Sequence, residues 1–193
     1  MANILDAPKA FSKLLDIQYQ FVLGRKDKTV SLTIEFQKYH FFHLAGLQYL
    51  KDLPRLFIPA EKVYNQIESG PLPVSYIESS NNYNYIKGRV EYLPSLEYIF
   101  NSNDTIFKYN PELQAFSVIE ADFLLRNEIN KVPIFVFLSK DKNEKYFCKT
   151  FFPQGKKDYT ERQTKWTVLF KKKIVKSTNT ETVLYKNKNF EIK

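Results

Sequence analysis

The chain has only two histidines, His40 and His43, which lie three residues apart in the apolar segment Phe36–Leu50. Histidine has an ordinary pKa near ~6.5, so it is the side chain best suited to move protons at neutral pH. In a helix, this spacing places both rings on one side, and Gly46 nearby leaves room for a ligand or another segment. The pair therefore predicts general acid–base chemistry, although a histidine on an apolar helix face can also be a hydrogen-bonded core residue. No thiol or carboxylate accompanies the pair at ligand spacing, which disfavours a metal site.

A second group of polar residues lies in the late segment Lys145–Phe152. Strand alternation places Lys145, Phe147, Lys149 and Phe151 on one face, which is typical of a ligand-binding surface. It places Tyr146, Cys148, Thr150 and Phe152 on the opposite face, which is more typical of core. Lys149 and Thr150 cannot both point at a ligand unless a β-bulge intervenes. Of the two, Lys149 is expected to point at the ligand.

The loop and the strand that follow contain further cations. The segment 153–163 carries Lys156, Lys157, Tyr159 and Arg162, and it is either part of a binding surface or an ordinary solvated hairpin loop. In the next strand, alternation predicts a core face of Trp166, Val168, Phe170 and Lys172, and an outer face of Lys165, Thr167, Leu169 and Lys171.

The net charge of +8 is concentrated in the last part of the chain. Residues 1–139 contain 14 basic and 15 acidic side chains, whereas residues 140–193 contain 15 basic and 6 acidic ones. A cationic patch attracts polyanions, and lysines interleaved with aromatic residues are typical of single-stranded nucleic-acid binding. The alternative is a lysine-rich surface that only keeps the protein soluble.

Several classes of protein are disfavoured by composition. No apolar run reaches the ~20 residues that cross a bilayer, and Met1–Leu15 has an Asp and a Pro where a secretory signal would have an apolar stretch. Cys148 is the single cysteine, so a disulfide framework and a cysteine-rich zinc site are excluded. Glycine-rich phosphate loops and hydrolase nucleophile elbows are also missing. We expect a cytoplasmic protein with no membrane association and no cofactor.

The elements that would position these residues change in character along the chain. Apolar periodicity predicts a hairpin of strands 17–23 and 29–35 joined by a loop at 24–28, and helices at 7–15, 36–50, 61–69 and 83–100. Strands are predicted at 105–109, 116–124, 132–138, 145–152, 166–174 and 182–186. This order predicts one α+β domain over 1–193, with a mainly helical part at 1–103 packed on a C-terminal antiparallel β-meander at 104–193.

Four motifs, in order, resemble a phage-associated branch of the barnase–EndoU–colicin–RelE-like (BECR) nucleases. They are the helix at Phe36–Leu50, the Asn-Asp turn and strand at Ser102–Tyr109, Thr150–Phe152 and Asp158–Gln163, and the resemblance extends from about residue 10 to about residue 185. It implies helices on a four-stranded antiparallel sheet and a metal-independent ribonuclease or toxin-type nuclease, with RNA as the substrate and an immunity or antitoxin protein as a partner.

The resemblance also implies roles for individual residues. His43 matches the helix histidine, Lys149 and Thr150 match a basic residue followed by a hydroxyl residue, and His40 is the less certain histidine. Tyr159 and Gln163 match the loop motif, and Lys108 matches the basic position after the Asn-Asp turn. Arg162 departs from the family, in which a glycine is expected before Gln163.

The resulting hypothesis is RNA cleavage by attack of the ribose 2′-hydroxyl on the adjacent phosphate. The predicted catalytic residues are His43, Lys149, Thr150, Tyr159 and His40. The predicted substrate-binding residues are Lys108, Arg89, Phe147, Lys145, Arg162, Gln163 and Lys165. Two alternatives remain: a non-catalytic module that binds single-stranded nucleic acid, and a phage or mobile-element protein that binds a host factor.

Overall fold

The computed structural model describes residues 6–102, 105–188 and 190–191, which form a mixed α/β structure. The strands are β1 (Ile17–Arg25), β2 (Lys28–Glu35), β3 (Thr105–Lys108), β4 (Phe123–Ile129), β5 (Val132–Lys140), β6 (Tyr146–Pro153), β7 (Thr164–Val175) and β8 (Thr180–Lys186). The helices are α1 (Asp6–Leu14), α2 (His40–Leu44), α3 (Ala60–Glu68), α4 (Val74–Glu78), α5 (Tyr83–Tyr92) and α6 (Leu96–Asn101). Four 3₁₀ turns connect them, at η1 (Leu47–Tyr49), η2 (Pro54–Leu56), η3 (Leu93–Ser95) and η4 (Pro111–Leu113).

The strands do not form the predicted open C-terminal meander, because the N-terminal hairpin is part of the same sheet. The strand order is β1-β2-β6-β5-β4-β3-β7-β8, and a further pairing of β1 with β7 closes seven of these strands into a barrel. The strands from β3 to β6 pair in chain order as a meander, whereas β7 pairs with β3 and β1 instead of β6. Alternation shows which face of a strand is buried but not which strand lies beside it, so the closure was not predictable.

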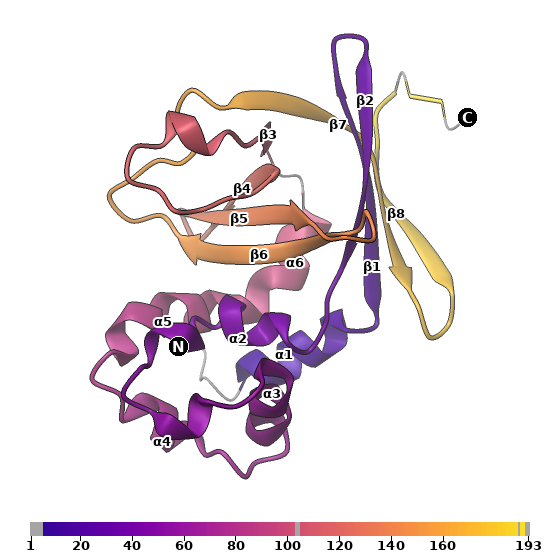
Figure 1. The fold of residues 1–193 in the computed structure, drawn as a ribbon. Helices are drawn as coiled ribbons and strands as arrows, with labels where there is room; N and C mark the ends of the chain where they lie inside the picture. The colour runs from indigo at the N-terminus through magenta and orange to yellow at the C-terminus, as the bar shows by residue number, and fades with distance from the viewer. Residues whose placement is uncertain (1–5, 103–104, 189, 192–193) are drawn as a thin grey trace.

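The hairpin β1–β2 is longer and its turn is tighter than the sequence predicted. Its antiparallel register extends to Arg25 and Lys28, so two residues connect the strands in place of the expected five-residue loop. Tyr19, Phe21 and Leu23 are fully buried inside the barrel while the residues between them are more exposed, up to the end of β1. Figure 1 shows this hairpin extending past the other strands.

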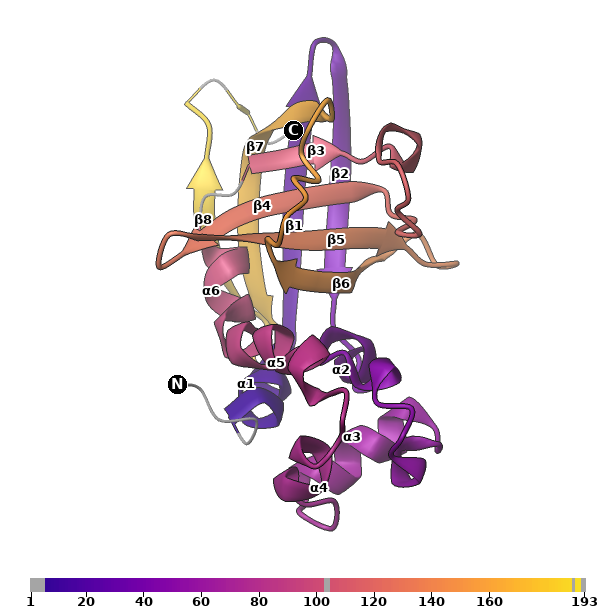
Figure 2. The ribbon, with the colours of Figure 1, turned by 90° about the vertical axis from the view of Figure 1, so that its left-hand side faces the viewer.

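The helices gather at one end of the barrel, with α3 and α4 furthest from it (Figures 1 and 2). One apolar core continues from the barrel interior into these helices, as the contacts of Phe100 on α6 with Tyr19, Phe21 and Phe36 show. The predicted arrangement of helices on one open sheet face is therefore replaced by helices that cover the end of a closed sheet.

Most of the helix predicted at 36–50 is not α-helical. Only α2, at His40–Leu44, is an α-helix, and the 3₁₀ turn η1 follows it. Gly46 separates the two with φ +78°, a left-handed conformation that ends a helix and favours glycine. The long helix predicted at 83–100 is likewise divided into α5, η3 and α6, with Pro94 in the 3₁₀ turn.

The predicted strands are found near their expected positions, with one clear exception. The segment predicted as a strand at 116–124 is irregular up to residue 122, and β4 begins at Phe123. Phe116 has φ +60° and is fully exposed, so it cannot pair in a strand there. The helices predicted at 7–15 and 61–69 correspond to α1 and α3 within one residue at each end.

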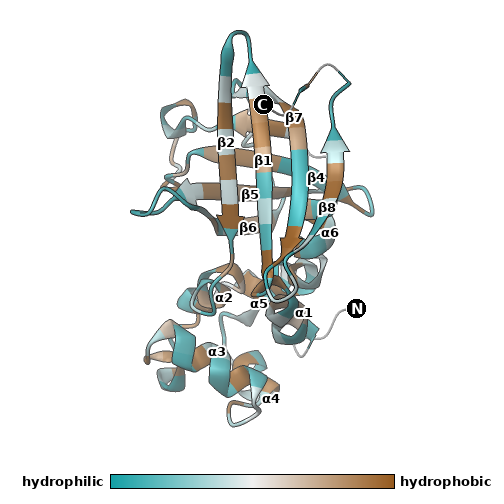
Figure 3. Ribbon diagram, turned by 90° about the vertical axis from the view of Figure 1, so that its right-hand side faces the viewer, coloured by the Kyte–Doolittle hydropathy of each residue, from teal (hydrophilic) through white to brown (hydrophobic). Residues whose placement is uncertain are grey.

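The alternation predicted for β7 is interrupted by a bulge. Val22 pairs with Phe170 and Leu23 with Val168, so Leu169 is an extra residue. After it, the side chains predicted to point inward point outward, and those predicted to point outward point inward. Lys171 therefore points inward at 1% exposure, where it donates hydrogen bonds to the carbonyls of Phe100, at 3.0 Å, and Ser102 at the C-terminal end of α6. Figure 3 shows that the middle of β7 is hydrophilic.

Candidate active site

A cavity of about 420 Å³ lies between the α2–η1 segment, α5 and β6, beside the loop that precedes β4. Its lining combines aromatic rings with basic and neutral polar groups, and none of the described residues that line it is acidic. They are Tyr39, His40, His43, Gln48, Tyr49, Arg89, Val118, Ile119, Phe147, Cys148, Lys149, Thr150 and Phe152. Six of the twelve residues predicted for the site are therefore brought together here: His40, His43, Arg89, Phe147, Lys149 and Thr150.

His43 is the histidine that is available to a ligand. It lies on α2, is exposed at its outer side, and lines the cavity. Within the described residues neither ring nitrogen has a hydrogen-bond partner. Partial loss of hydration lowers the pKa of the His43 imidazole below its ordinary value. The ring is therefore neutral at pH 7 and can accept a proton.

His40 has a different environment, in which its ring is 6% exposed. The ring stacks on Phe147 with centroids 5.0 Å apart and planes at 12°, and Nδ1 accepts a hydrogen bond from the backbone N–H of Gln37 at 3.0 Å. Burial, assisted by the nearby His43 and opposed by Asp141, lowers the pKa of His40 to about 4. His40 is therefore a neutral wall residue, with its proton on Nε2.

Arg89 reaches the cavity from α5. Its Nη1 donates to Thr150 Oγ1 at 2.7 Å and to the carbonyl oxygen of Phe151 at 2.9 Å. The guanidinium lies 5.5 Å from the ring centroid of Tyr49 and 5.2 Å from that of Phe152. Burial lowers the pKa of Arg89, but arginine stays charged at neutral pH. Its other guanidinium nitrogens have no acceptor among the described residues.

A β-bulge in β6 allows both Lys149 and Thr150 to line the cavity. Phe137 pairs with Thr150 and Leu138 with Cys148, so Lys149 is the extra residue. Before the bulge, Tyr146 and Cys148 point to the core as predicted. After the bulge the inward and outward side chains exchange sides. Phe151 is therefore fully buried, and Thr150 and Phe152 line the cavity. The unbroken alternation predicted for this strand is therefore wrong beyond Cys148.

The charge of the cavity is positive and uncompensated. No described carboxylate forms a salt bridge with Arg89 or Lys149. Thr150 and His43 add hydrogen-bonding groups without negative charge. An arrangement of two cations, a hydroxyl and a neutral imidazole is suited to bind a phosphate and to move a proton beside it.

A family model described as phage-Barnase-EndoU-ColicinE5/D-RelE like nuclease4 matches residues 3–188, nearly the whole chain. The chain belongs to this nuclease family. No curated protein and no solved structure shows significant similarity to it. The family assignment agrees with the resemblance of the four sequence motifs, and a nuclease family implies a nucleic-acid substrate.

Two features of this phage-type nuclease concern membrane-spanning helices and clusters of metal-binding side chains. Among the described residues, no helix is long and apolar enough to cross a membrane. In the same residues, no three or more side chains of His, Cys, Asp or Glu are grouped as they would be around a metal ion.

The other predicted site residues of the nuclease lie outside this cavity. Lys108 pairs with Asp122 at 3.4 Å, and Lys165 lies on β7 opposite Phe107. Lys145 pairs with Glu35 at 2.9 Å in an adjoining cavity that shares Tyr39, His40 and Phe147 with the first. Tyr159 packs against Phe152, a residue of the cavity wall, with ring centroids 5.5 Å apart.

The Asp158–Gln163 motif supports the loop structure. Gln163 is buried and forms two hydrogen bonds with the backbone of Asn110. Gln163 Oε1 accepts from the Asn110 N–H at 2.7 Å, and Gln163 Nε2 donates to the Asn110 carbonyl at 2.9 Å. Arg162, where the family resemblance predicts glycine, has φ +62°. This left-handed conformation favours glycine, so the departure changes the residue type but not the backbone geometry.

Sequence reasoning missed four polar or aromatic residues of the cavity. Tyr39, Gln48 and Tyr49 belong to a segment that was interpreted as one continuous helix, and Phe152 was assigned to the core by alternation. Gly46 was the signal for Gln48 and Tyr49, because a glycine in an apolar run often ends a helix. No comparable signal precedes the bulge in β6.

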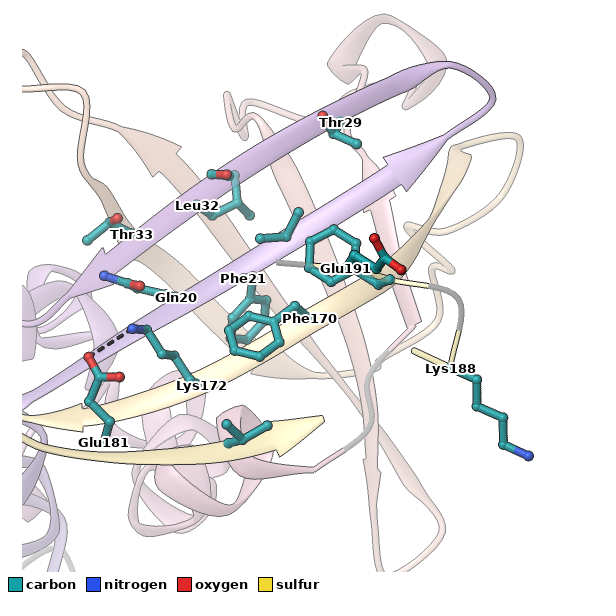
Figure 4. A pocket seen from close by; sticks show the side chains of 14 residues that line it. Gln20, Phe21, Thr29, Leu32, Thr33, Phe170, Lys172, Glu181, Lys188 and Glu191 are labelled. Carbon is teal, nitrogen blue, oxygen red and sulfur yellow. Dashed lines mark hydrogen bonds and ion pairs between the residues drawn. The ribbon is translucent and has the colours of Figure 1, made fainter. Parts of the chain in front are cut away.

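A larger cavity, of about 1250 Å³, lies on the β1–β2–β7–β8 side of the nuclease (Figure 4). It contains no histidine, and its Lys172 is paired with Glu181 at 2.8 Å. Phe170, which points outward because of the β7 bulge, lies in its wall. This surface therefore lacks the proton-transfer group that the smaller cavity has.

Proposed function

We propose that the protein is an endoribonuclease that cleaves RNA at the cavity between α2, α5 and β6, without a metal ion. The proposal depends on one observation: a histidine whose ring has no hydrogen-bond partner among the described residues shares a cavity with two cations that no described carboxylate neutralises. Membership of the nuclease family supports it.

His43 is the residue proposed to take the proton of the attacking 2′-hydroxyl. Its pKa is lowered by partial burial, so the neutral form that accepts a proton predominates at pH 7. The 2′ oxygen bonds to phosphorus, the bond from phosphorus to the 5′ oxygen breaks, and solvent supplies the proton to the leaving oxygen. Positioned proton transfer of this kind contributes about 10²–10⁴-fold to a rate.

Arg89 and Lys149 are proposed to stabilise the charge on the pentavalent phosphate. Arg89 is held in place by its hydrogen bonds to Thr150 Oγ1 and Phe151 O and by the Tyr49 and Phe152 rings. Lys149 is exposed at the bulge and free to approach the substrate. Thr150 fixes Arg89 and so positions it toward the phosphate. RNA is the preferred substrate because its nucleophile is internal to the chain that is cleaved.

A second candidate function is binding of single-stranded nucleic acid without cleavage. The rings of Tyr49 and Phe152 beside Arg89 favour it, because aromatic faces and cations together hold single strands. The two functions differ in their need for His43, since stacking and phosphate binding do not require a proton acceptor.

The test is incubation of RNA with the protein in the presence of a chelator. We expect cleavage by the wild type, a loss of about 10²–10⁴-fold in His43→Ala with RNA binding retained, and wild-type rates in Lys28→Ala, which replaces an exposed lysine on β2. Cleavage that needs a divalent metal, or that survives in His43→Ala, would contradict the proposal. Binding without cleavage by the wild type would support the second function.

A further inference from the structure

Two buried polar atoms in the wall of the cavity have no hydrogen-bond partner in the described structure. They are Nε2 of His40 and Oε1 of Gln48. His40 Nδ1 accepts a hydrogen bond, so the proton of the neutral ring lies on Nε2 and this atom is a donor. The wall therefore presents one unpaired donor and one unpaired acceptor.

Such atoms are rare in folded proteins, because nearly all buried polar groups form hydrogen bonds. Here both line one cavity, although His40 belongs to α2 and Gln48 to η1. Thr150 and Arg89, by contrast, have internal partners. A ligand that supplies both an acceptor and a donor would explain why the two atoms remain unpaired.

The rest of the cavity wall is suited to a flat ligand. Tyr49, Phe147 and Phe152 line it, and aromatic faces stack on any nucleobase. The volume of about 420 Å³ is in the range of small-molecule sites. Each nucleobase places a donor beside an acceptor on its pairing edge, and their order in adenine and cytosine is the reverse of that in guanine and uracil. A fixed donor and a fixed acceptor in the wall can therefore distinguish these two pairs of bases.

We propose that His40 and Gln48 recognise the nucleobase adjacent to the cleaved phosphate and determine the base preference of the enzyme. This inference rests on the proposed ribonuclease function. Both atoms are buried, so the proposal requires a side chain of the cavity wall to move when the base binds. Tyr39 is the candidate beside His40, because it is 51% exposed and meets the His40 ring edge-on with ring centroids 4.3 Å apart.

The experiment measures binding of the four nucleoside 3′-monophosphates by calorimetry, with inorganic phosphate as a reference. In the wild type we expect about a tenfold or greater difference between the tightest and the weakest. Gln48→Met, which keeps the size of the side chain, should reduce this difference to about twofold and leave phosphate binding unchanged. Gln66→Met on α3 is the matched control and should keep the wild-type difference.

His40→Phe is a second test, since it removes the Nε2 donor but keeps a ring against Phe147. Its folding is checked by thermal melting, and Gln48→Met tests the inference if it does not fold. Equal binding of the four nucleotides by the wild type, or an unchanged difference in Gln48→Met, would overturn the inference. Selective binding without RNA cleavage would reject the ribonuclease but retain the base site, whereas cleavage with equal binding would do the reverse.

Discussion

The two histidines of α2 show how the environment of a residue determines what it can do. His43 is exposed to the cavity and its ring nitrogens have no partner among the described residues, so it can exchange protons with a ligand. His40, one turn earlier, is buried against Phe147 and remains neutral. Their spacing alone could not distinguish these roles, because the difference arises from the strand β6 that packs against the helix.

The burial of His40 predicts a loss of stability in mild acid. Its pKa of about 4 in the folded protein lies below the ordinary value of 6.5, so between these values the unfolded chain binds a proton that the folded chain does not. Stability is therefore complete above pH 6.5 and falls toward pH 4, by about 3 kcal/mol for this group. Urea unfolding from pH 4 to 7 should show a flatter profile in His40→Phe, and parallel profiles would contradict the prediction.

Lys149 allows the chemistry of the site to be separated from the stability of the fold. Its side chain is exposed, so Lys149→Gln should change the free energy of unfolding by less than about 0.5 kcal/mol. Loss of one preorganised contact to the phosphate should lower cleavage by about 10²–10³-fold. Single-turnover cleavage and urea unfolding check the two parts, with Lys28→Gln as the control. A small change in cleavage would place the phosphate away from the bulge.

At the scale of elements, the sequence predicts the positions of the strands well, but it predicts less well which of their side chains point inward. The predicted strands at 132–138 and 145–152 agree with β5 and β6 to within one or two residues at each end. Alternation then fails after Cys148 and before Phe170, where Lys149 and Leu169 are bulged residues. No residue type in these strands marks the position of the bulge. The inward position of Lys171 and the cavity position of Phe152 could therefore only be found in the structure.

Gly46 connects α2 to the position of Arg89. A Cβ atom there would lie 2.8 Å from Arg89 Cδ and 2.9 Å from Ile86 Cγ2, and the residue has φ +78°. Gly46→Ala should therefore destabilise the protein and displace Arg89, lowering cleavage by about 10²-fold. Gly70→Ala is the matched control, because Gly70 has φ +95° but no atom within 4 Å of the added Cβ.

The difference between the two glycine variants isolates the contact with Arg89 and Ile86 from the backbone strain. We expect Gly46→Ala to be about 1–3 kcal/mol less stable than Gly70→Ala, as for overpacking of a core. Chemical unfolding and cleavage measure the two effects. Equal stability of the two variants, with normal cleavage in both, would contradict the prediction. It would mean that α5 can move to accommodate the added methyl group without displacing Arg89 from the site.

At the scale of the whole molecule, charge that is concentrated in sequence is dispersed in space. Of the lysines after residue 139, Lys145 pairs with Glu35, Lys172 with Glu181 and Lys173 with Glu97, and Lys171 is inside the barrel. The sequence located the excess of positive charge correctly but could not show the pairings with Glu35 and Glu97, because the fold brings these early carboxylates to late strands. The unpaired charge that faces the cavity comes from Lys149 and from Arg89, which lies in the balanced part of the chain.

This dispersal predicts a modest salt dependence of RNA binding. For single strands the slope of log K against log salt is about −0.7 for each phosphate contact. Two cations, Arg89 and Lys149, give a slope of about −1.4, whereas contacts by all nine excess charges of residues 140–193 would give about −6. Lys149→Gln should reduce the slope to about −0.7, and Lys28→Gln should leave it unchanged. Fluorescence anisotropy with a short single-stranded RNA measures these slopes. A steep slope that Lys149→Gln does not alter would place the strand along the lysines of β7 and β8, away from the histidine.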